Sequence, residues 1–140
     1  MATTNLVGTV VPTEEQSQQI DAALDTAVGV LSTFCVPLSE GDRGEFLRPR
    51  SGAEKLMPLV FEVATEKKLD IDGMPLEGLE SDLKVGVKAD RFEKRLEVMR
   101  QLAADTRLAA YGEAYQAFLA YYGVLASMDK HDPALAKRLQ

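Results

Sequence analysis

Hydrophobic residues recur at steps of three and four positions between Asp105 and Met128, which is the period of one helix face. A second apolar set follows one residue out of phase, so we predict a central helix that is buried on two sides. The first face contains Leu108, Tyr111, Tyr115, Phe118, Tyr122 and Leu125. The second contains Ala110, Ala114, Ala117, Tyr121, Val124 and Met128.

The uncharged part of this helix is too short to cross a membrane. It extends from Ala114 to Met128, a run of 15 residues, whereas a membrane-spanning helix needs about 20. Gln116 and the four tyrosine hydroxyl groups lie within or beside this run. We therefore expect no association with a membrane.

An earlier helix is predicted to begin at Thr13. Thr13 and Gln16 have the spacing of a capping box, and apolar residues at helical spacing continue through Leu31 and Phe34 or Cys35 to Leu38. Pro37 should end this helix near Val36, because the residue before a proline avoids the helical conformation.

A second helix is predicted over about residues 52–68. Ser51 and Glu54 repeat the capping-box spacing at its start. Pro58 lies inside the apolar pattern, so either the helix kinks there or a first turn breaks and restarts at Pro58. We predict one kinked helix. Residues 39–50 contain two glycines and a proline and are predicted to form a loop.

Two more helices should complete the chain beside the central one. The longer is predicted over about residues 76–104, with Asp105 and Thr106 forming a turn or bend into the central helix. Asp132 and Pro133 have the cap and first-turn chemistry that begins a short final helix.

These elements predict an all-α fold, an up-down four-helix bundle with a short C-terminal helix. The connections are short enough for antiparallel neighbours, and no segment alternates in the manner of a strand. Residues 1–12 are predicted to be an N-terminal arm that is partly disordered, and residues 13–140 a single helical domain.

Charge and cysteine content disfavour several classes of protein. The net charge of −6 disfavours nucleic-acid binding, because neutralising phosphates requires an excess of lysine and arginine. The one cysteine, Cys35, cannot form an internal disulfide. The sequence begins without a secretory signal pattern, so the cytoplasm is the expected location.

Residues suited to metal, cofactor or catalytic chemistry are few. The single histidine, His131, and Cys35 cannot close a zinc or di-metal site. The sequence has no glycine-rich phosphate loop, nucleophile elbow or dinucleotide-binding motif. We therefore expect no cofactor, no structural metal and no catalytic constellation.

Arg48, Arg50 and Ser51 form a candidate anion-binding site. Two guanidinium groups precede the predicted start of a helix, where free backbone N–H groups and the helix dipole favour anions. The alternative is that both arginines are solvated and pair with Asp42 or Glu45.

Tyr111, Glu113, Tyr115 and Tyr122 are candidates to line a pocket between helices. A glutamate on an apolar helix can be buried beside a phenol or Arg107, and perturbed carboxylates are frequent at functional sites. The alternative places Glu113 at the one exposed position of the helix and packs the tyrosines into a core.

Several segments resemble small bacterial α-helical proteins of unassigned function. The segments are residues 37–66, the sequence LESDL at 79–83, and DTRLAAYGEAYQAFLAYY at 105–122. The resemblance extends over about residues 16–139, and Pro58 and Gly86 depart from it, which indicates interruptions in two helices. It implies a helical bundle and no particular activity. Its matching residues are Asp105, Thr106, Glu113, Ala114, Tyr115 and Tyr122.

The sequence supports two functions of different classes. The first is a non-enzymatic interaction or scaffold protein, which forms a homodimer or binds another protein through the apolar surface of the central helix. The second is a small-ligand binding protein or enzyme whose pocket is formed by the tyrosines and Glu113, with Arg48 and Arg50 as anion partners. The two differ in whether the tyrosines line a pocket.

Overall fold

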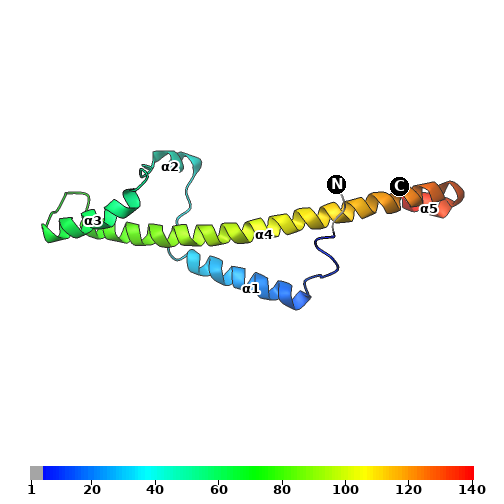
Figure 1. The fold of residues 1–140 in the computed structure, drawn as a ribbon, viewed down its shortest axis with the longest axis horizontal. Helices are drawn as coiled ribbons and strands as arrows, with labels where there is room; N and C mark the ends of the chain where they lie inside the picture. Colours follow the sequence, from blue (N-terminus) through cyan, green and yellow to red (C-terminus); the bar gives the residue numbers. More distant parts are fainter. Residues whose placement is uncertain (1–4) are drawn as a thin grey trace. The chain divides into compact units, whose positions relative to one another are not determined.

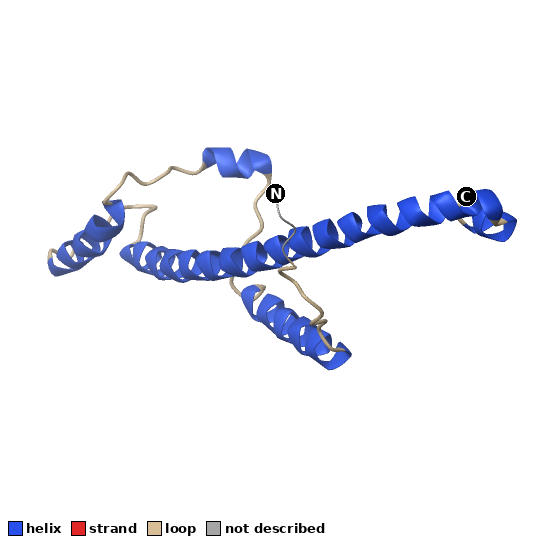
Figure 2. Ribbon diagram, turned by 45° about the vertical axis from the view of Figure 1, so that its right-hand side comes forward, coloured by secondary structure: helices blue, strands red, loops and turns tan. Residues whose placement is uncertain are grey.

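The computed structural model describes residues 5–140, which form five α-helices and one short 3-10 helix joined by loops (Figures 1 and 2). The described residues contain no β-strand, and their one β-type pairing is an isolated bridge between Ile71 and Met74. The prediction of an all-α fold is confirmed. The first four residues of the predicted N-terminal arm lie outside the described residues.

The chain divides into two compact units, and the longest helix, α4 (Leu76–Met128), contributes to both. One unit contains Pro12–Lys94. The other contains Arg95–Gln140 together with the described part of Met1–Val11. The N-terminal arm and the C-terminal half of α4 therefore belong to the same unit, although they are far apart in the sequence.

The first helix, α1 (Glu14–Leu31), begins where the sequence predicts. The Thr13 hydroxyl oxygen accepts a hydrogen bond from the Gln16 N–H at 3.0 Å, and the Thr13 N–H donates to the Gln16 side chain at 2.9 Å. The predicted capping box is confirmed, and two N–H groups that the helix itself cannot pair are satisfied.

The end of α1 comes earlier than the predicted position near Val36. After Leu31, the hydroxyl groups of Ser32 and Thr33 donate to backbone carbonyls at 2.7 Å. Serine and threonine side chains compete with the helical backbone for its own hydrogen-bonding groups, which favours termination here. Pro37 is therefore not needed to stop the helix.

A short helix, α2 (Glu40–Glu45), lies within the segment 39–50 that the sequence predicts to be a loop, so the prediction is wrong there. Ser39 and Asp42 form a second capping box, with hydrogen bonds of 3.1 and 3.2 Å. The helix contains two glycines, and glycine is the poorest helix former after proline, so the sequence of this segment favours a loop.

The third helix, α3 (Ala53–Glu66), begins after Gly52, whose φ of 90° is a conformation that residues with a side chain rarely adopt. Its N-cap has no side-chain hydrogen bond, so the predicted capping box of Ser51 and Glu54 is wrong. Pro58 lies inside this helix, which continues past it to Glu66.

The fourth helix, α4, is continuous over 53 residues, so the predicted turn at Asp105 and Thr106 is wrong. Neither residue breaks a helix, and both side chains are satisfied within it. Asp105 accepts from the Gln101 side chain at 2.8 Å, and the Thr106 hydroxyl donates to the Leu102 carbonyl at 2.8 Å. Two predicted helices are therefore one, and an up-down four-helix bundle is not confirmed.

The chain ends in a 3-10 turn, η1 (Asp129–His131), and a short helix, α5 (Pro133–Arg138). The Asp132 side chain accepts a hydrogen bond from the Leu135 N–H at 3.1 Å, and Pro133 lies in the first turn. This confirms the predicted final helix. α5 folds back beside the end of α4 (Figures 1 and 2).

Among the described residues, only Ala64 is buried. Tyr111 is 73% exposed and Phe118 is 52% exposed, so the prediction that the central helix is buried on two sides is wrong for these residues. Full burial of one large apolar side chain contributes about 1.5–3 kcal/mol to stability. The described helices therefore lack most of the burial that normally offsets the entropy of folding.

Candidate interaction surface

The C-terminal half of α4 carries what we call the aromatic face. Its residues are spaced alternately three and four positions apart, which keeps them in one line along a helix. Because the face is a single line, one neighbouring helix can cover all of it. The aromatic face consists of Leu108, Tyr111, Tyr115, Phe118, Tyr122 and Leu125.

Three rings of the aromatic face contact one another along the helix. The ring centroids of Tyr115 and Phe118 are 5.7 Å apart with an interplanar angle of 25°, and those of Phe118 and Tyr122 are 5.6 Å apart with an angle of 31°. Apolar pairs at this spacing on a helix surface contribute about 0.2–0.5 kcal/mol each. The contacts order the rings along the helix without burying them.

Solvent reaches the four rings of the aromatic face, whereas Leu125 at its end is half-buried. The exposed fractions are 73% for Tyr111, 60% for Tyr115, 52% for Phe118 and 44% for Tyr122. An aromatic side chain has about 150–250 Å² to bury, so these four rings present roughly 450 Å² of unburied surface. Continuous apolar patches of this size on a protein surface commonly mark interaction sites.

The N-terminal arm contacts a different side of the same helix. The backbone N–H of Leu6 donates a hydrogen bond to the carboxylate of Glu113, and Ala109, Ala110 and Glu113 are half-buried. Glu113 follows Tyr111 by two residues, which is about 200° around a helix axis. The arm therefore lies away from the aromatic face and leaves that face uncovered.

The structure does not bring Glu113 together with the tyrosines of the predicted pocket. Tyr111, Tyr115 and Tyr122 lie on the aromatic face, whereas Glu113 lies on the side of α4 that the arm contacts. The partner of Glu113 among the described residues is a backbone amide, and neither a phenol nor Arg107 takes that place.

Arg48, Arg50 and Ser51 are exposed and belong to the other unit, in the segment before α3. The N–H of Ala53, the first residue of α3, donates to the Arg50 carbonyl at 3.0 Å, so this donor is already used. Within the described chain, neither guanidinium forms an ion pair, and Asp42 and Glu45 form none either. The anion-binding hypothesis stays a prediction.

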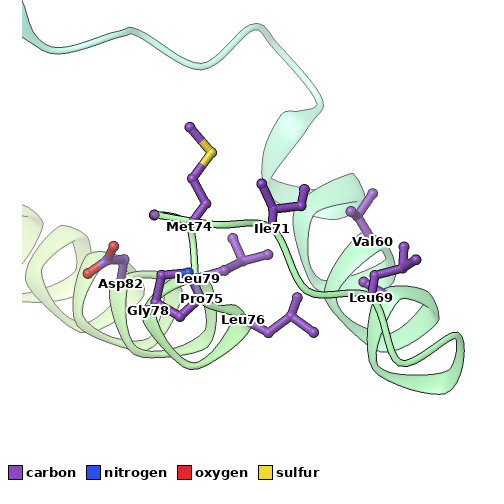
Figure 3. A pocket seen from close by; sticks show the side chains of 11 residues that line it. Val60, Leu69, Ile71, Met74, Pro75, Leu76, Gly78, Leu79 and Asp82 are labelled. Atoms are coloured by element: carbon purple, nitrogen blue, oxygen red, sulfur yellow. The ribbon is translucent and has the colours of Figure 1, made fainter.

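An apolar hollow of about 530 Å³ lies between α3 and the start of α4 (Figure 3). The turn between the two helices supplies Leu69, Ile71 and Met74, and Asp82 is the one charged residue in the lining. The sequence analysis missed this site. The three apolar side chains in this short turn are the signal in the sequence that indicates it.

Charged pairs follow the outer surface of α4. Lys94 bonds to Asp90 at 2.8 Å, and Arg100 bonds to Glu97 at 2.8 Å. The hydrogen bond from Arg100 lowers the pKa of the Glu97 carboxyl, and the Glu97 carboxylate raises the pKa of Arg100. Such exposed pairs contribute little to stability, so they mark a solvated face.

The described residues show no cluster of three or more histidine, cysteine, aspartate or glutamate side chains arranged to hold a metal ion. No helix in the described part of the chain is long and apolar enough to cross a membrane. Cys35 is exposed, and its neighbour Phe34 lies 6.4 Å from Phe92, measured between ring centroids.

Comparison of the chain with protein-family models, with curated proteins and with solved structures finds no match. The resemblance to small bacterial helical proteins therefore stays a prediction.

Proposed function

We propose that this protein is a non-enzymatic helical interaction protein that self-associates, and that it does so through the aromatic face of α4. The observation that carries the proposal is the exposure of this face in a chain whose described residues include one buried side chain, Ala64. The proposed function is therefore self-assembly, in which the aromatic face of each copy covers the aromatic face of the other copy.

An interface with another chain would supply the apolar burial that a single copy lacks. Ordering a backbone costs about 1–2 kcal/mol per residue, and apolar burial is the main term that offsets it. A chain that leaves its large side chains in solvent gains little of this term alone. A second copy that covers the aromatic face supplies it at the place where the unburied surface is continuous.

The aromatic face suits a second copy of the same chain. It carries no charged residue, so two copies meet without repulsion, and symmetric homodimers are the commonest protein assemblies. A standard interface buries about 800 Å² on each partner. The aromatic rings offer more than half of this, and neighbouring exposed residues such as Leu119 and Met128 extend it.

In this proposal the up-down four-helix bundle forms only when two copies assemble. Helices from two copies would provide the neighbours that the sequence pattern requires. Burial of the second apolar face of α4, which includes Tyr121 and Val124, would then follow from assembly rather than from folding of one chain.

Binding of a small ligand is the second candidate function, and the hollow beside α3 is the observation that favours it. Its volume of about 530 Å³ falls within the range of ligand pockets. The lining is almost entirely apolar, so the ligand would be apolar rather than the anion suggested by Arg48 and Arg50. Retention of such a ligand is a direct readout of this alternative.

Sedimentation velocity over a wide range of protein concentration tests the proposal. We expect a concentration-dependent dimer or larger oligomer. Tyr115→Ala should weaken association because it removes a ring from the middle of the aromatic face. Val98→Ala is the matched control, since Val98 is 68% exposed on the same helix and belongs to neither apolar face.

Native mass spectrometry of the purified protein separates the two candidate functions. A monomer at every concentration would contradict self-association. A monomer that retains a small apolar molecule, lost when Ile71 or Leu79 is replaced by aspartate, would favour the second candidate instead.

A further inference from the structure

We propose that two copies pair through their aromatic faces in antiparallel orientation and in one register. The inference rests on the proposed function, because it specifies how self-association takes place. The occupant of the aromatic face is the same face of a second copy, with the midpoint of the pair between Gln116 and Ala117.

The alternating spacing of the face defines this register. In an antiparallel helix pair, each residue that follows a four-residue step packs against one that follows a three-residue step on the partner. Under this rule every residue of the aromatic face pairs with a residue of the same face on the second copy, and none is left without a partner. Leu108 then faces Leu125 of the second copy, Tyr111 faces Tyr122, and Tyr115 faces Phe118.

The positions beside the aromatic face are small where the opposite position is large. In the proposed register, Ala114 lies beside Tyr121 of the second copy, and Gly112 lies beside Leu119. A β-carbon added at Gly112 would meet no atom within 4 Å in the single chain, so nothing within one copy requires a glycine there. A large side chain approaching from a second copy provides a reason for it.

The charges at the ends of the face favour the antiparallel orientation. Asp129, the first residue of η1 directly after α4, follows Leu125 by four positions and so continues the line of the face. In the proposed register it lies opposite Ala104 of the second copy and one helical turn from Arg107. An opposite charge is therefore within reach of a long side chain at each end of the pair.

A parallel pair in register places like charges together. The same line would bring Asp129 directly opposite Asp129 of the second copy, and like charges across an interface disfavour the arrangement. The uncharged residues between Leu108 and Leu125 do not distinguish the two orientations, so the flanking residues decide it.

The side of α4 opposite the aromatic face already has a neighbour within the single chain. The N-terminal arm contacts α4 at Glu113 through the Leu6 amide, and the residues next to that contact, Ala109 and Ala110, are half-buried. The four rings of the aromatic face lie on the side that remains exposed, and they are available to the second copy.

Cysteine cross-linking of the full chain tests orientation and register. Cys35→Ser provides a background without thiols, into which Leu108→Cys or Leu125→Cys is introduced. The two positions are 17 residues apart, about 25 Å along a helix. Under a glutathione redox buffer, a mixture of the two variants should form a mixed disulfide dimer, and each variant alone should form about tenfold less.

The outcomes separate this inference from the proposed function. A disulfide dimer formed by Leu108→Cys alone would show a parallel pair, and would overturn the orientation while leaving self-association intact. A dimer in solution that forms none of these cross-links would overturn the register. A chain that remains a monomer would overturn both proposals.

Charge exchange provides a second measurement without cysteine. Arg107→Asp and Asp129→Arg should each raise the dimer dissociation constant by about fivefold, a factor that corresponds to a surface pair. The double variant should return it close to the value of the unchanged protein. If the double variant is as weak as the single ones, Arg107 and Asp129 do not meet and the register is wrong.

Discussion

The backbone N–H of Leu6 donates a hydrogen bond to the carboxylate of Glu113, which lies 107 positions later in the chain. The bond joins the N-terminal arm to α4 within one unit. It gives a role to a carboxylate that sits in a largely apolar stretch of helix, and it satisfies an amide of a segment that has no regular secondary structure.

Removal of the Glu113 carboxylate should release the arm. Glu113→Ala eliminates the acceptor, whereas Glu113→Gln keeps a neutral one, and charge-assisted hydrogen bonds are roughly twice as strong as neutral ones. Amide hydrogen exchange at Leu6 should therefore be fastest in the alanine variant and intermediate in the glutamine variant. Glu62→Ala, an exposed position in α3, is the control, and equal exchange at Leu6 in all three variants would contradict the contact.

Thr106→Ala should stabilise the protein slightly. Thr106 lies in the interior of α4, where alanine is favoured over threonine by about 0.5 kcal/mol. If Thr106 capped a helix that began after a turn, the same change would instead cost about 1 kcal/mol. Urea unfolding at fixed protein concentration measures the sign, and a loss of stability would support the turn.

Two apparent caps should respond differently to alanine. Thr13→Ala removes a hydroxyl that accepts a hydrogen bond from Gln16 and should cost about 0.5–2 kcal/mol. Ser51→Ala removes a hydroxyl that caps nothing and should stay within about 0.5 kcal/mol of the unchanged protein. Urea unfolding monitored by circular dichroism compares them, and equal losses would mean that Ser51 does cap α3.

Acid should weaken the bond between Glu97 and Arg100. Because the Arg100 hydrogen bond lowers the folded pKa of Glu97, the contribution of this bond is present at neutral pH and is lost as the pH falls through that lowered pKa. Carboxyl carbon shifts in an NMR titration should show Glu97 titrating at higher pH in Arg100→Gln. An unchanged titration would show that the bond does not persist in solution.

Local hydrogen-bonding signals predicted the starts of two helices, α1 and α5. The Thr13–Gln16 spacing and the Asp132–Pro133 pair both gave the observed caps, because each depends on neighbours within three residues. The same signal at Ser51 failed because Gly52 adopts a left-handed conformation that takes over the capping position. The capping box at Ser39 was not predicted, because the two glycines that follow it disfavour a helix.

The helix boundaries and the site could not be predicted from the same signals. Asp105 and Thr106 favour turns when considered alone, but Gln101 and Leu102 satisfy them inside a helix. The period of the sequence predicts which residues form the aromatic face. It does not predict that the face is exposed, because periodicity shows which residues share a side of a helix and not what covers that side. The hollow beside α3 depends on how a turn folds back, which no period reveals.

Among the described residues only Ala64 is buried, and this has a consequence for the abundance of the protein. If copies complete one another, the folded fraction follows the law of mass action, and dilution acts as a denaturant. Newly synthesised chains would remain open to proteases until enough of them had accumulated to meet. Stability would then be a property of the population, and would rise with the rate of synthesis without any change in a single residue.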